Sequence, residues 1–190
     1  MNNKNYTVYH LHSYYSNDCG LADSCTSPND YIQLAKEQGM TAIAFSEHGN
    51  AYNWIKKKQD CDKAGIKYIH GTELYLCTKL ESDERGGHIG LYAKNWDGVL
   101  ELNKLLSIAT SQGVKEDKTD RHKYFNHRIS LQELMSTSDN IIVTSACIAS
   151  PLNKWDNPEY QDEYRALINW MTKNKNRCFF EIQYHNDDTQ

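Results

Sequence analysis

Short apolar segments alternate with longer amphipathic ones along most of this 190-residue chain. The run MTAIAFS at residues 40–46 is too short for an unaided helix and predicts a buried strand, whereas residues 31–39 have helical spacing and stop at Gly39. Asn29 or Asp30 is the expected cap of that helix. Further helices are expected at residues 54–64, 96–110 and 160–174, and further strands at residues 6–11, 67–76, 88–95, 140–146 and 178–184. The alternation predicts an α/β fold, a parallel sheet or barrel with crossover helices, with its chemistry at the carboxyl ends of the strands.

Size and charge limit the classes of protein that fit. A chain of this length suits one domain with a sizeable core, and it contains no repeat or low-complexity tract. The net charge of −4 lacks the electrostatic footprint of a general nucleic-acid binder. The chain has neither an apolar leader nor a stretch of membrane-spanning length, so a soluble cytoplasmic protein without membrane contact is expected. Its six cysteines form no CxxC pair and are expected to be mostly reduced.

The segment YHLHS places His10 and His12 at the end of the first expected strand. Residues i and i+2 of a strand point to the same face, so the two imidazoles lie side by side in a chelating geometry. Other potential ligands stand at or near further strand ends, namely Glu47, His48, Glu73, His88 and Cys147. Imidazole, carboxylate and thiolate suit zinc and similar divalent ions, and a carboxylate such as Glu73 can bridge neighbouring ions. Their distribution over five segments predicts a metal site at the mouth of a barrel.

Each of these side chains also has an ordinary structural interpretation. Taken alone, Glu73 would be a surface acid, His88 a loop residue after two glycines, and Cys147 a buried apolar thiol. The spacing of His10 and His12 favours ligation by itself, and the joint pattern favours it for the other residues. The remaining histidines are expected to be structural or solvent-exposed; they are His70, His122, His127 and His185.

Seven motifs occur in order along the chain: HLHSYYS, AIAFSEHGN, GTELY, GGHIGLYAKN, HRISLQEL, SACIASPL and FFEIQYH. Over about residues 6–185 they resemble the PHP domain at the N-terminus of bacterial and phage DNA polymerase III alpha subunits. The resemblance implies one PHP domain over residues 1–190 with a distorted (β/α)7 barrel. It also implies up to nine ligands around a cluster of three divalent ions, whether zinc, manganese or magnesium. The catalytic residues would be His10, His12, Glu73 and His48.

Carried over to matching positions, the resemblance assigns these ligands to three ions. The first ion takes His10, His12 and Glu73; the second takes Glu73, His88 and Cys147; the third takes His48 and an acid upstream of it.

The upstream acid has two candidates in the loop YYSNDCGLADSC. Asp23 is the expected ligand, because it stands eight residues before Tyr31 at the hydrophobic start of the next helix. Asp18, counted forward from His12, is the alternative. A loop acid without a ligand role remains the ordinary interpretation of either.

Two departures from the family pattern bear on the site. The second motif has SEHG where many relatives have TDHG, so Glu47 is expected to support the neighbouring ligand rather than bind metal itself. The family's last motif, an Asp-x-His on the final barrel strand, has no match before Gln190. The expected barrel therefore lacks its last strand, and the PHP domain is incomplete at its C-terminal end. The chain would be a piece of a polymerase or a free-standing product.

The resemblance implies a metal-dependent phosphoesterase that forms part of a DNA-directed DNA polymerase. Metal ions lower the pKa of bound water and stabilise charge on phosphate oxygens, which suits 3′–5′ exonuclease or phosphodiesterase chemistry. The partners would be the remaining polymerase domains, DNA and a proofreading subunit. The alternatives are a structural scaffold without catalysis and a free-standing PHP phosphatase. The basic stretch KEDKTDRHKYFNHR would contact DNA or form a solvated loop.

Overall fold

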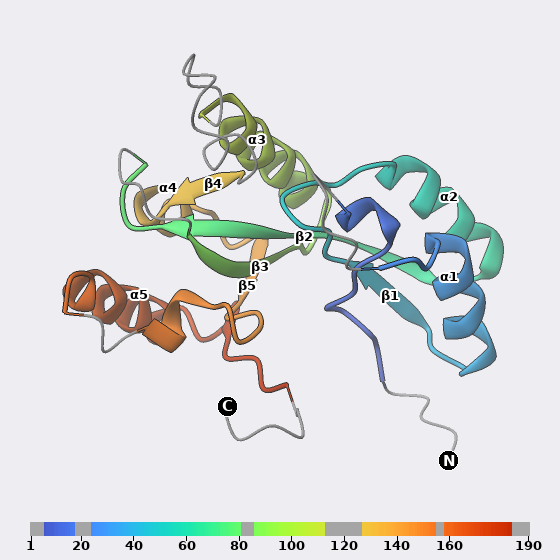
Figure 1. Ribbon diagram of the computed structural model, residues 1–190. Helices are drawn as coiled ribbons and strands as arrows, with labels where there is room; N and C mark the ends of the chain where they lie inside the picture. The colour runs from blue at the N-terminus through green and yellow to red at the C-terminus, as the bar shows by residue number, and fades with distance from the viewer. Residues whose placement is uncertain (1–5, 18–23, 81–85, 113–126, 155–157, 184–190) are drawn as a thin grey trace.

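The computed structural model describes residues 6–17, 24–80, 86–112, 127–154 and 158–183. They form a mixed α/β fold in which helices pack around a central six-stranded sheet (Figure 1). The strands are β1 (Ala42–Phe45), β2 (Lys67–Cys77), β3 (Gly87–Ala93), β4 (Arg128–Ser130), β5 (Ile141–Thr144) and β6 (Cys178–Phe179). The helices are α1 (Pro28–Glu37), α2 (Trp54–Ala64), α3 (Trp96–Gln112), α4 (Leu131–Met135) and α5 (Gln161–Lys173), with short 3-10 turns η1 (Tyr14–Ser16) and η3 (Pro151–Lys154).

The first helix begins earlier than the sequence predicts. Ser27 is the N-cap of α1 and accepts a hydrogen bond from the Asp30 N–H, so the cap expected at Asn29 or Asp30 is wrong. Pro28 follows the cap at the first helical position, where its missing N–H has no intrahelical partner to lose. Helix α2 has the predicted bounds, because Gly65 adopts the left-handed conformation, φ +75°, that ends it.

The sheet is mixed rather than parallel. Strand β1 runs parallel to β2, with Phe45 opposite His70, and β6 runs parallel to β5. Strand β3, however, is antiparallel to both β2 and β5. The expected parallel arrangement is therefore wrong at β3, because residues 78–86 are too short a connection for a crossover helix.

Both ends of the sheet are less regular than predicted. Residues 6–11 were expected as a strand, but they form one bridge, Val8 to Ile43, with a backbone hydrogen bond from the Ala44 N–H to the Val8 carbonyl. Strand β6 comprises two residues, where residues 178–184 were expected. Among the described residues no backbone pairing joins β6 to residues 6–12, so this sheet is not closed.

The motif HRISLQEL forms two elements that were not predicted as such, β4 and α4. Ser130 ends β4 and starts α4 through a capping box with Glu133, which leaves little room for a loop between them. Strand β4 pairs in parallel with the far half of β2, so β2 borders β1 over its first residues and β4 over its last.

Alternation along the strands separates a core face of the sheet from a polar face. Leu74 and Leu76 of β2, with Ile89 and Leu91 of β3, are fully or almost fully buried in a cluster that includes residues of α3, α4 and α5. A second cluster joins α1 and α2 to β1. Alternate residues of β2, β3 and β5 point to the other face, namely Glu73, Tyr75, His88, Gly90 and Thr144. No described helix is long and apolar enough to cross a membrane.

Candidate metal centre

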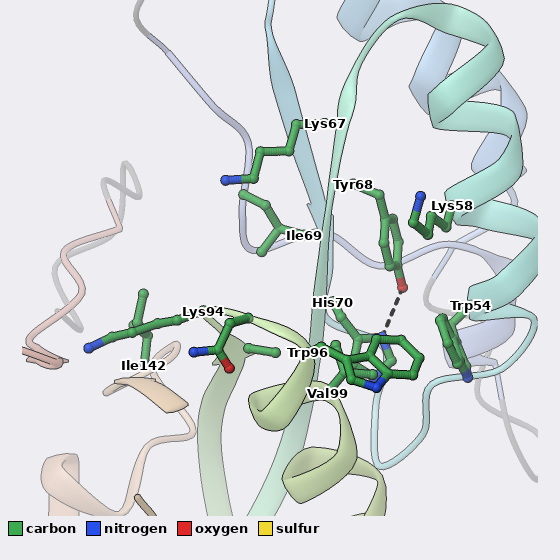
Figure 2. Close-up of a pocket in the computed structure, with 12 residues that line it drawn as sticks. Trp54, Lys58, Lys67, Tyr68, Ile69, His70, Lys94, Trp96, Val99 and Ile142 are labelled. Atoms are coloured by element: carbon green, nitrogen blue, oxygen red, sulfur yellow. Dashed lines mark hydrogen bonds between the residues drawn. The ribbon is translucent and has the colours of Figure 1, made fainter. Parts of the chain in front are cut away.

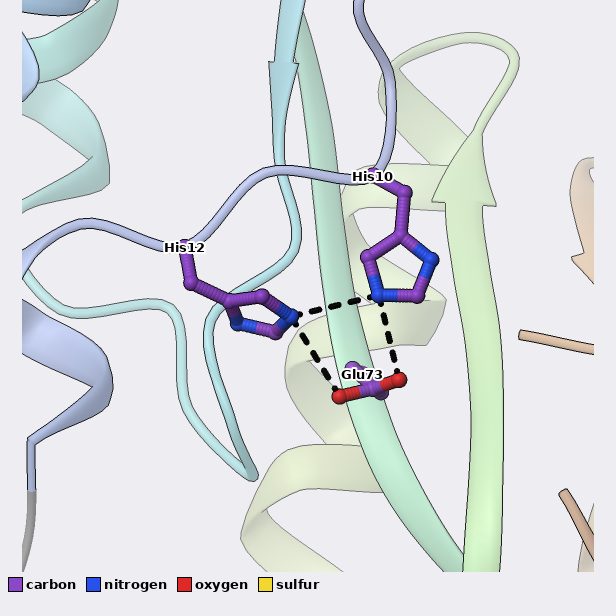
Figure 3. A group of neighbouring side chains, drawn as sticks. All are labelled: His10, His12 and Glu73. Carbon is purple, nitrogen blue, oxygen red and sulfur yellow. Dashed lines mark hydrogen bonds and ion pairs between the residues drawn. The ribbon is translucent and has the colours of Figure 1, made fainter. Parts of the chain in front are cut away.

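The backbone places four histidines around one glutamate. Glu73 lies in the middle of β2, opposite Gly90 of β3. Two residues further along β2, Tyr75 lies opposite His88 of β3. His48 follows β1 and forms an isolated parallel bridge with Glu73 itself, closed by a hydrogen bond from the Gly49 N–H to the Glu73 carbonyl. The chain beside β1 carries His10 and His12 over the same carboxylate, as Figure 3 shows.

Short distances join each imidazole to the Glu73 carboxylate. His10 Nε2 lies 3.2 Å from Oε1, and His12 Nε2 lies 3.5 Å from Oε2. The Nδ1 atoms of His48 and His88 lie 2.9 Å and 3.1 Å from Oε2. The Nε2 atoms of His10 and His12 are 3.2 Å apart. Two groups of three ligand atoms result, His10–His12–Glu73 and His48–Glu73–His88, each within 4.8 Å of one another.

The donor set of these two groups fits a divalent cation. The Glu73 side chain is 1% exposed, yet neither carboxylate oxygen accepts a well-aligned hydrogen bond from the described residues. A buried carboxylate without such donors is costly unless a cation compensates it. Imidazole and carboxylate are the ligands that zinc, manganese and similar ions take. The two groups therefore offer ligand atoms of the kind that a metal centre needs, and Glu73 belongs to both groups.

The pKa values of His10 and His12 are shifted in opposite directions. Burial lowers the pKa of His10, but its hydrogen bond to Glu181 and its close contact with the Glu73 carboxylate outweigh this effect and raise the pKa to about 9. Burial lowers the pKa of His12 to about 4, and the charge of Glu73 only partly opposes this. For Glu73, contacts with His10, His48 and His88 overcome the effect of burial and hold the pKa below its ordinary value. The Glu73 carboxylate is therefore ionised at the centre of the cluster.

Cys147 reaches the cluster from the end of β5. Its Sγ lies 3.4 Å from His88 Nδ1. The preceding residue, Ala146, is buried and has a left-handed backbone with φ +55°, which an alanine rarely adopts. Burial, and then the charge of Glu73, raise the pKa of Cys147 to about 11, which favours the protonated thiol.

Glu47 faces away from Glu73, into a buried network of its own. Its carboxylate accepts hydrogen bonds from the Ser13 N–H, the Ser16 hydroxyl and Lys57 Nζ, the last at 2.7 Å. Lys57 and Glu47 are 2% and 1% exposed, so this is a buried ion pair. Burial alone would raise the pKa of Glu47, but the Lys57 charge holds it below its ordinary value. The Ser16 hydroxyl also lies 3.0 Å from His12 Nδ1, which links the network to one imidazole of the cluster.

Other predicted positions fall outside the cluster or outside the described residues. His70 is buried and lies within hydrogen-bonding distance of Tyr68 and Asn103, which is a structural arrangement. The His127 ring packs against Gly49, where an added Cβ would lie 2.7 Å from its Nδ1. The expected third-ion acid and the remaining histidines lie outside the described part of the chain; they are Asp23, Asp18, His122 and His185.

One functional candidate, Glu181, was not assigned any role from the sequence. It lies two residues beyond β6, and its Oε1 is 2.7 Å from His10 Nδ1. The side chain is 2% exposed. In the sequence Glu181 is marked only as the one acid of the motif FFEIQYH, and its contact is with a residue 171 positions away.

A hollow of about 400 Å³, separate from the Glu73 cluster, lies at the amino end of β2 (Figure 2). Aromatic rings of Trp54, Tyr68 and Trp96 line it, and the two tryptophan rings are 6.3 Å apart. Its twelve lining residues include the lysines at 58, 67 and 94 and no acid. The hollow therefore has aromatic and cationic character, unlike the acidic and imidazole cluster at Glu73.

Comparison with known sequences identifies the family of this chain. A family model described as "PHP domain" matches residues 9–185, and the chain belongs to this family.

Curated relatives that match it include DNA polymerase III alpha subunits. The subunit of Borreliella burgdorferi is 33% identical over 93% of this chain, and that of Campylobacter jejuni is 32% identical over 95%. The chain spans 15% of the length of each relative. Among solved structures, one described as a metal-dependent phosphoesterase from Bifidobacterium adolescentis matches 55% of this chain and 33% of its own, with 15% identity and a TM-score of 0.39.

Proposed function

We propose that this chain is the PHP domain of a DNA polymerase III alpha subunit and that its histidine cluster is a metal-dependent phosphoesterase site. The observation that carries the proposal is the buried Glu73 carboxylate with four imidazole nitrogens within 3.5 Å. Similarity to polymerase subunits supports the substrate class, a phosphodiester of DNA. The reaction would be hydrolysis at a 3′ end, the chemistry of a 3′–5′ exonuclease.

The proposed ligands are His10, His12 and Glu73 for one ion, and His48, Glu73 and His88 for a second, with Cys147 beside His88. Zinc, manganese and magnesium are the candidate ions. Such ions would supply Lewis acidity and lower the pKa of bound water. The chain itself contributes the fixed directions of the imidazoles and a buried carboxylate that remains ionised. Asp23 remains the proposed additional acid.

We also infer that the sheet belongs to a distorted (β/α)7 barrel. The inference is supported by the 2.7 Å contact of Glu181 with His10, because these residues lie at opposite ends of the strand order. The remaining polymerase domains and a proofreading subunit are the proposed protein partners. A scaffold role without catalysis is the competing proposal.

Metal content tests the proposal against the scaffold alternative. The chain is loaded with zinc or manganese, freed of excess ion and assayed by elemental analysis, together with Glu73→Gln and the exposed control Glu37→Gln. We expect about one ion or more per wild-type and control chain, and less than about one-tenth in Glu73→Gln. Less than about one-tenth of an ion in the wild type would support the scaffold role.

Activity is measured on single-stranded DNA and on a chromogenic phosphodiester. Weak hydrolysis that His12→Ala abolishes and Glu37→Gln retains is expected, because His12 Nε2 lies against the Glu73 carboxylate. Hydrolysis that survives His12→Ala would place the activity elsewhere.

The hollow at the amino end of β2 favours a second role, contact with single-stranded DNA. Trp96 is 61% exposed, and exposed aromatic rings provide platforms on which bases stack. Lysines beside them neutralise phosphates; Lys58 is already paired with Asp62, which leaves Lys67 and Lys94 as the proposed phosphate contacts.

Quenching of tryptophan fluorescence by an oligothymidylate tests this contact. Quenching should weaken as salt rises and should fall in Lys94→Gln more than in Lys36→Gln, a control with the same change of charge on α1. Equal behaviour of the two variants would exclude the hollow as the contact.

A further inference from the structure

Glu181 holds His10 from the side opposite the cluster. The Glu181 carboxylate accepts a hydrogen bond from His10 Nδ1 at 2.7 Å, and the other ring nitrogen, Nε2, faces Glu73 Oε1 at 3.2 Å. An ionised carboxylate only accepts hydrogen bonds, so Nδ1 is the nitrogen that carries the proton. The lone pair that His10 can offer to a cation is then on Nε2.

Two further contacts hold the Glu181 carboxylate, and a third holds its backbone. Thr144 Oγ1 donates to Oε2 at 3.1 Å, and Gln183 Nε2 donates to Oε1 at 2.7 Å. The Glu181 backbone N–H donates to Ser145 Oγ at 2.8 Å. Because the side chain is also 2% exposed, water competes little for these oxygens. The position of Glu181 is therefore set by β5, which lies beside it.

A glycine makes room for this arrangement. Gly90 of β3 pairs with both Glu73 and Thr144, one on either side. A Cβ at this position would lie 2.3 Å from Thr144 Oγ1, closer than any real side chain tolerates. The missing side chain allows the Thr144 hydroxyl to occupy the polar face of the sheet, from which it reaches Glu181.

We propose that Glu181 is a positioning residue of the metal centre, which fixes the tautomer and ring direction of His10 so that Nε2 faces the ion. The proposal rests on the proposed metal site and adds to it a residue outside the ligand set. Carboxylates that hold a ligating histidine in this way typically change metal affinity by about 10- to 100-fold when they are removed. Glu181 need not touch the ion to have this effect.

The test is metal affinity, measured by competition with a chelating dye for manganese and zinc, without any substrate. The variants are Glu181→Gln and Glu181→Ala, with Glu37→Gln as the control for the same chemical change at an exposed site. We expect affinity about 10- to 100-fold weaker in Glu181→Ala, a smaller loss in Glu181→Gln, and none in the control. Wild-type affinity in Glu181→Ala would overturn the proposal.

A spectroscopic signature separates positioning from a general structural effect. Long-range proton–nitrogen NMR of the histidine rings should show His10 with its proton on Nδ1 in the metal-loaded wild type, and a mixture of tautomers in Glu181→Ala. If Glu181→Ala does not fold, Thr144→Val is used instead, because it removes only one donor to the carboxylate. Unchanged affinity and tautomer in Thr144→Val would then overturn the proposal.

The outcomes distinguish this inference from the proposed function. Failure of the wild-type chain to bind metal would remove the metal site and, with it, the role of Glu181. Metal binding by the wild type that is unaffected by Glu181→Ala would leave the site in place and remove only the positioning role.

Discussion

Glu181 Oε1 lies 2.7 Å from His10 Nδ1, and this contact joins the two ends of a sheet whose backbone pairing stops short of closure. His10 stands beside β1, at one end of the strand order, and Glu181 follows β6 at the other. The polar face of the sheet is thereby enclosed where the imidazoles converge.

Bound metal should stabilise the folded chain. A ligand that binds only the native state, at one hundred times its dissociation constant, adds about 2.7 kcal/mol to the free energy of unfolding. Urea unfolding with and without manganese measures the effect, which Glu73→Gln should abolish and Glu37→Gln should preserve. An equal metal effect in Glu73→Gln would show that the ion binds elsewhere.

Gly90→Ala should disturb the sheet at Thr144. The added Cβ would lie 2.3 Å from Thr144 Oγ1, and overpacking of this kind costs about 1–3 kcal/mol. Thermal unfolding measures the loss, and the double variant Gly90→Ala/Thr144→Ala should recover part of it because the hydroxyl is gone. No recovery in the double variant would mean that the clash lies with the Tyr92 ring, which is 3.3 Å from the same Cβ.

Lys57→Met should leave the Glu47 carboxylate buried without its cation. Breaking a buried ion pair costs about 3–5 kcal/mol, and the double variant Lys57→Met/Glu47→Gln should restore much of the stability. The Glu47 pKa is held below its ordinary 4.5. The ionised carboxylate therefore adds to the free energy of unfolding above that pH, and this stabilisation is lost as the pH falls below it.

The direction of the Glu47 pKa shift also determines how the loss of stability in Lys57→Met depends on pH. Without Lys57 the carboxyl protonates more readily, so the stability difference between wild type and variant should narrow from pH 7 to pH 4. Urea unfolding at both pH values measures the difference. A difference that grows in acid would contradict the role given to this ion pair.

Ala146→Gly should be close to neutral for stability, although Ala146 is buried. Relief of the left-handed backbone, about 1–2 kcal/mol, offsets the lost methyl group and the added chain entropy, each worth about 1 kcal/mol. Ala44→Gly is the control, because Ala44 is fully buried in β1 and has no positive φ. Equal destabilisation by the two substitutions would contradict the account of Ala146.

The sequence predicts elements best where local chemistry marks their ends. Helix α2 has the predicted bounds because Gly65 ends it, and β2 is long and apolar enough to be recognised. The direction of β3 could not be taken from strand–helix alternation, since it depends on the short connection at residues 78–86. The N-cap of α1 was misplaced because Asn29 and Asp30 are also favourable caps, whereas Pro28 fixes the start one residue after Ser27.

The site was predictable as far as it depends on residue type and strand position. The structure brings together five of the predicted ligands, although His10 and His12 lie on a segment that is bridged to β1 rather than on the expected strand; the five are His10, His12, His48, Glu73 and His88. Glu181 was missed because a single acid beside a short strand has no local signal of its role. Its partner is 171 residues away, and only the assembled sheet brings the two together.

The attachment of residues 6–12 has a consequence for how the cluster opens. This segment is held to β1 through Val8 and Leu11, which accept hydrogen bonds from Ala44 and Ser46, whereas Glu73 belongs to an eleven-residue central strand. Segments with few backbone hydrogen bonds exchange their amide protons through local opening at low free energy. We therefore expect the cluster to combine a carboxylate on a long central strand with two imidazoles on a segment that opens at lower free energy.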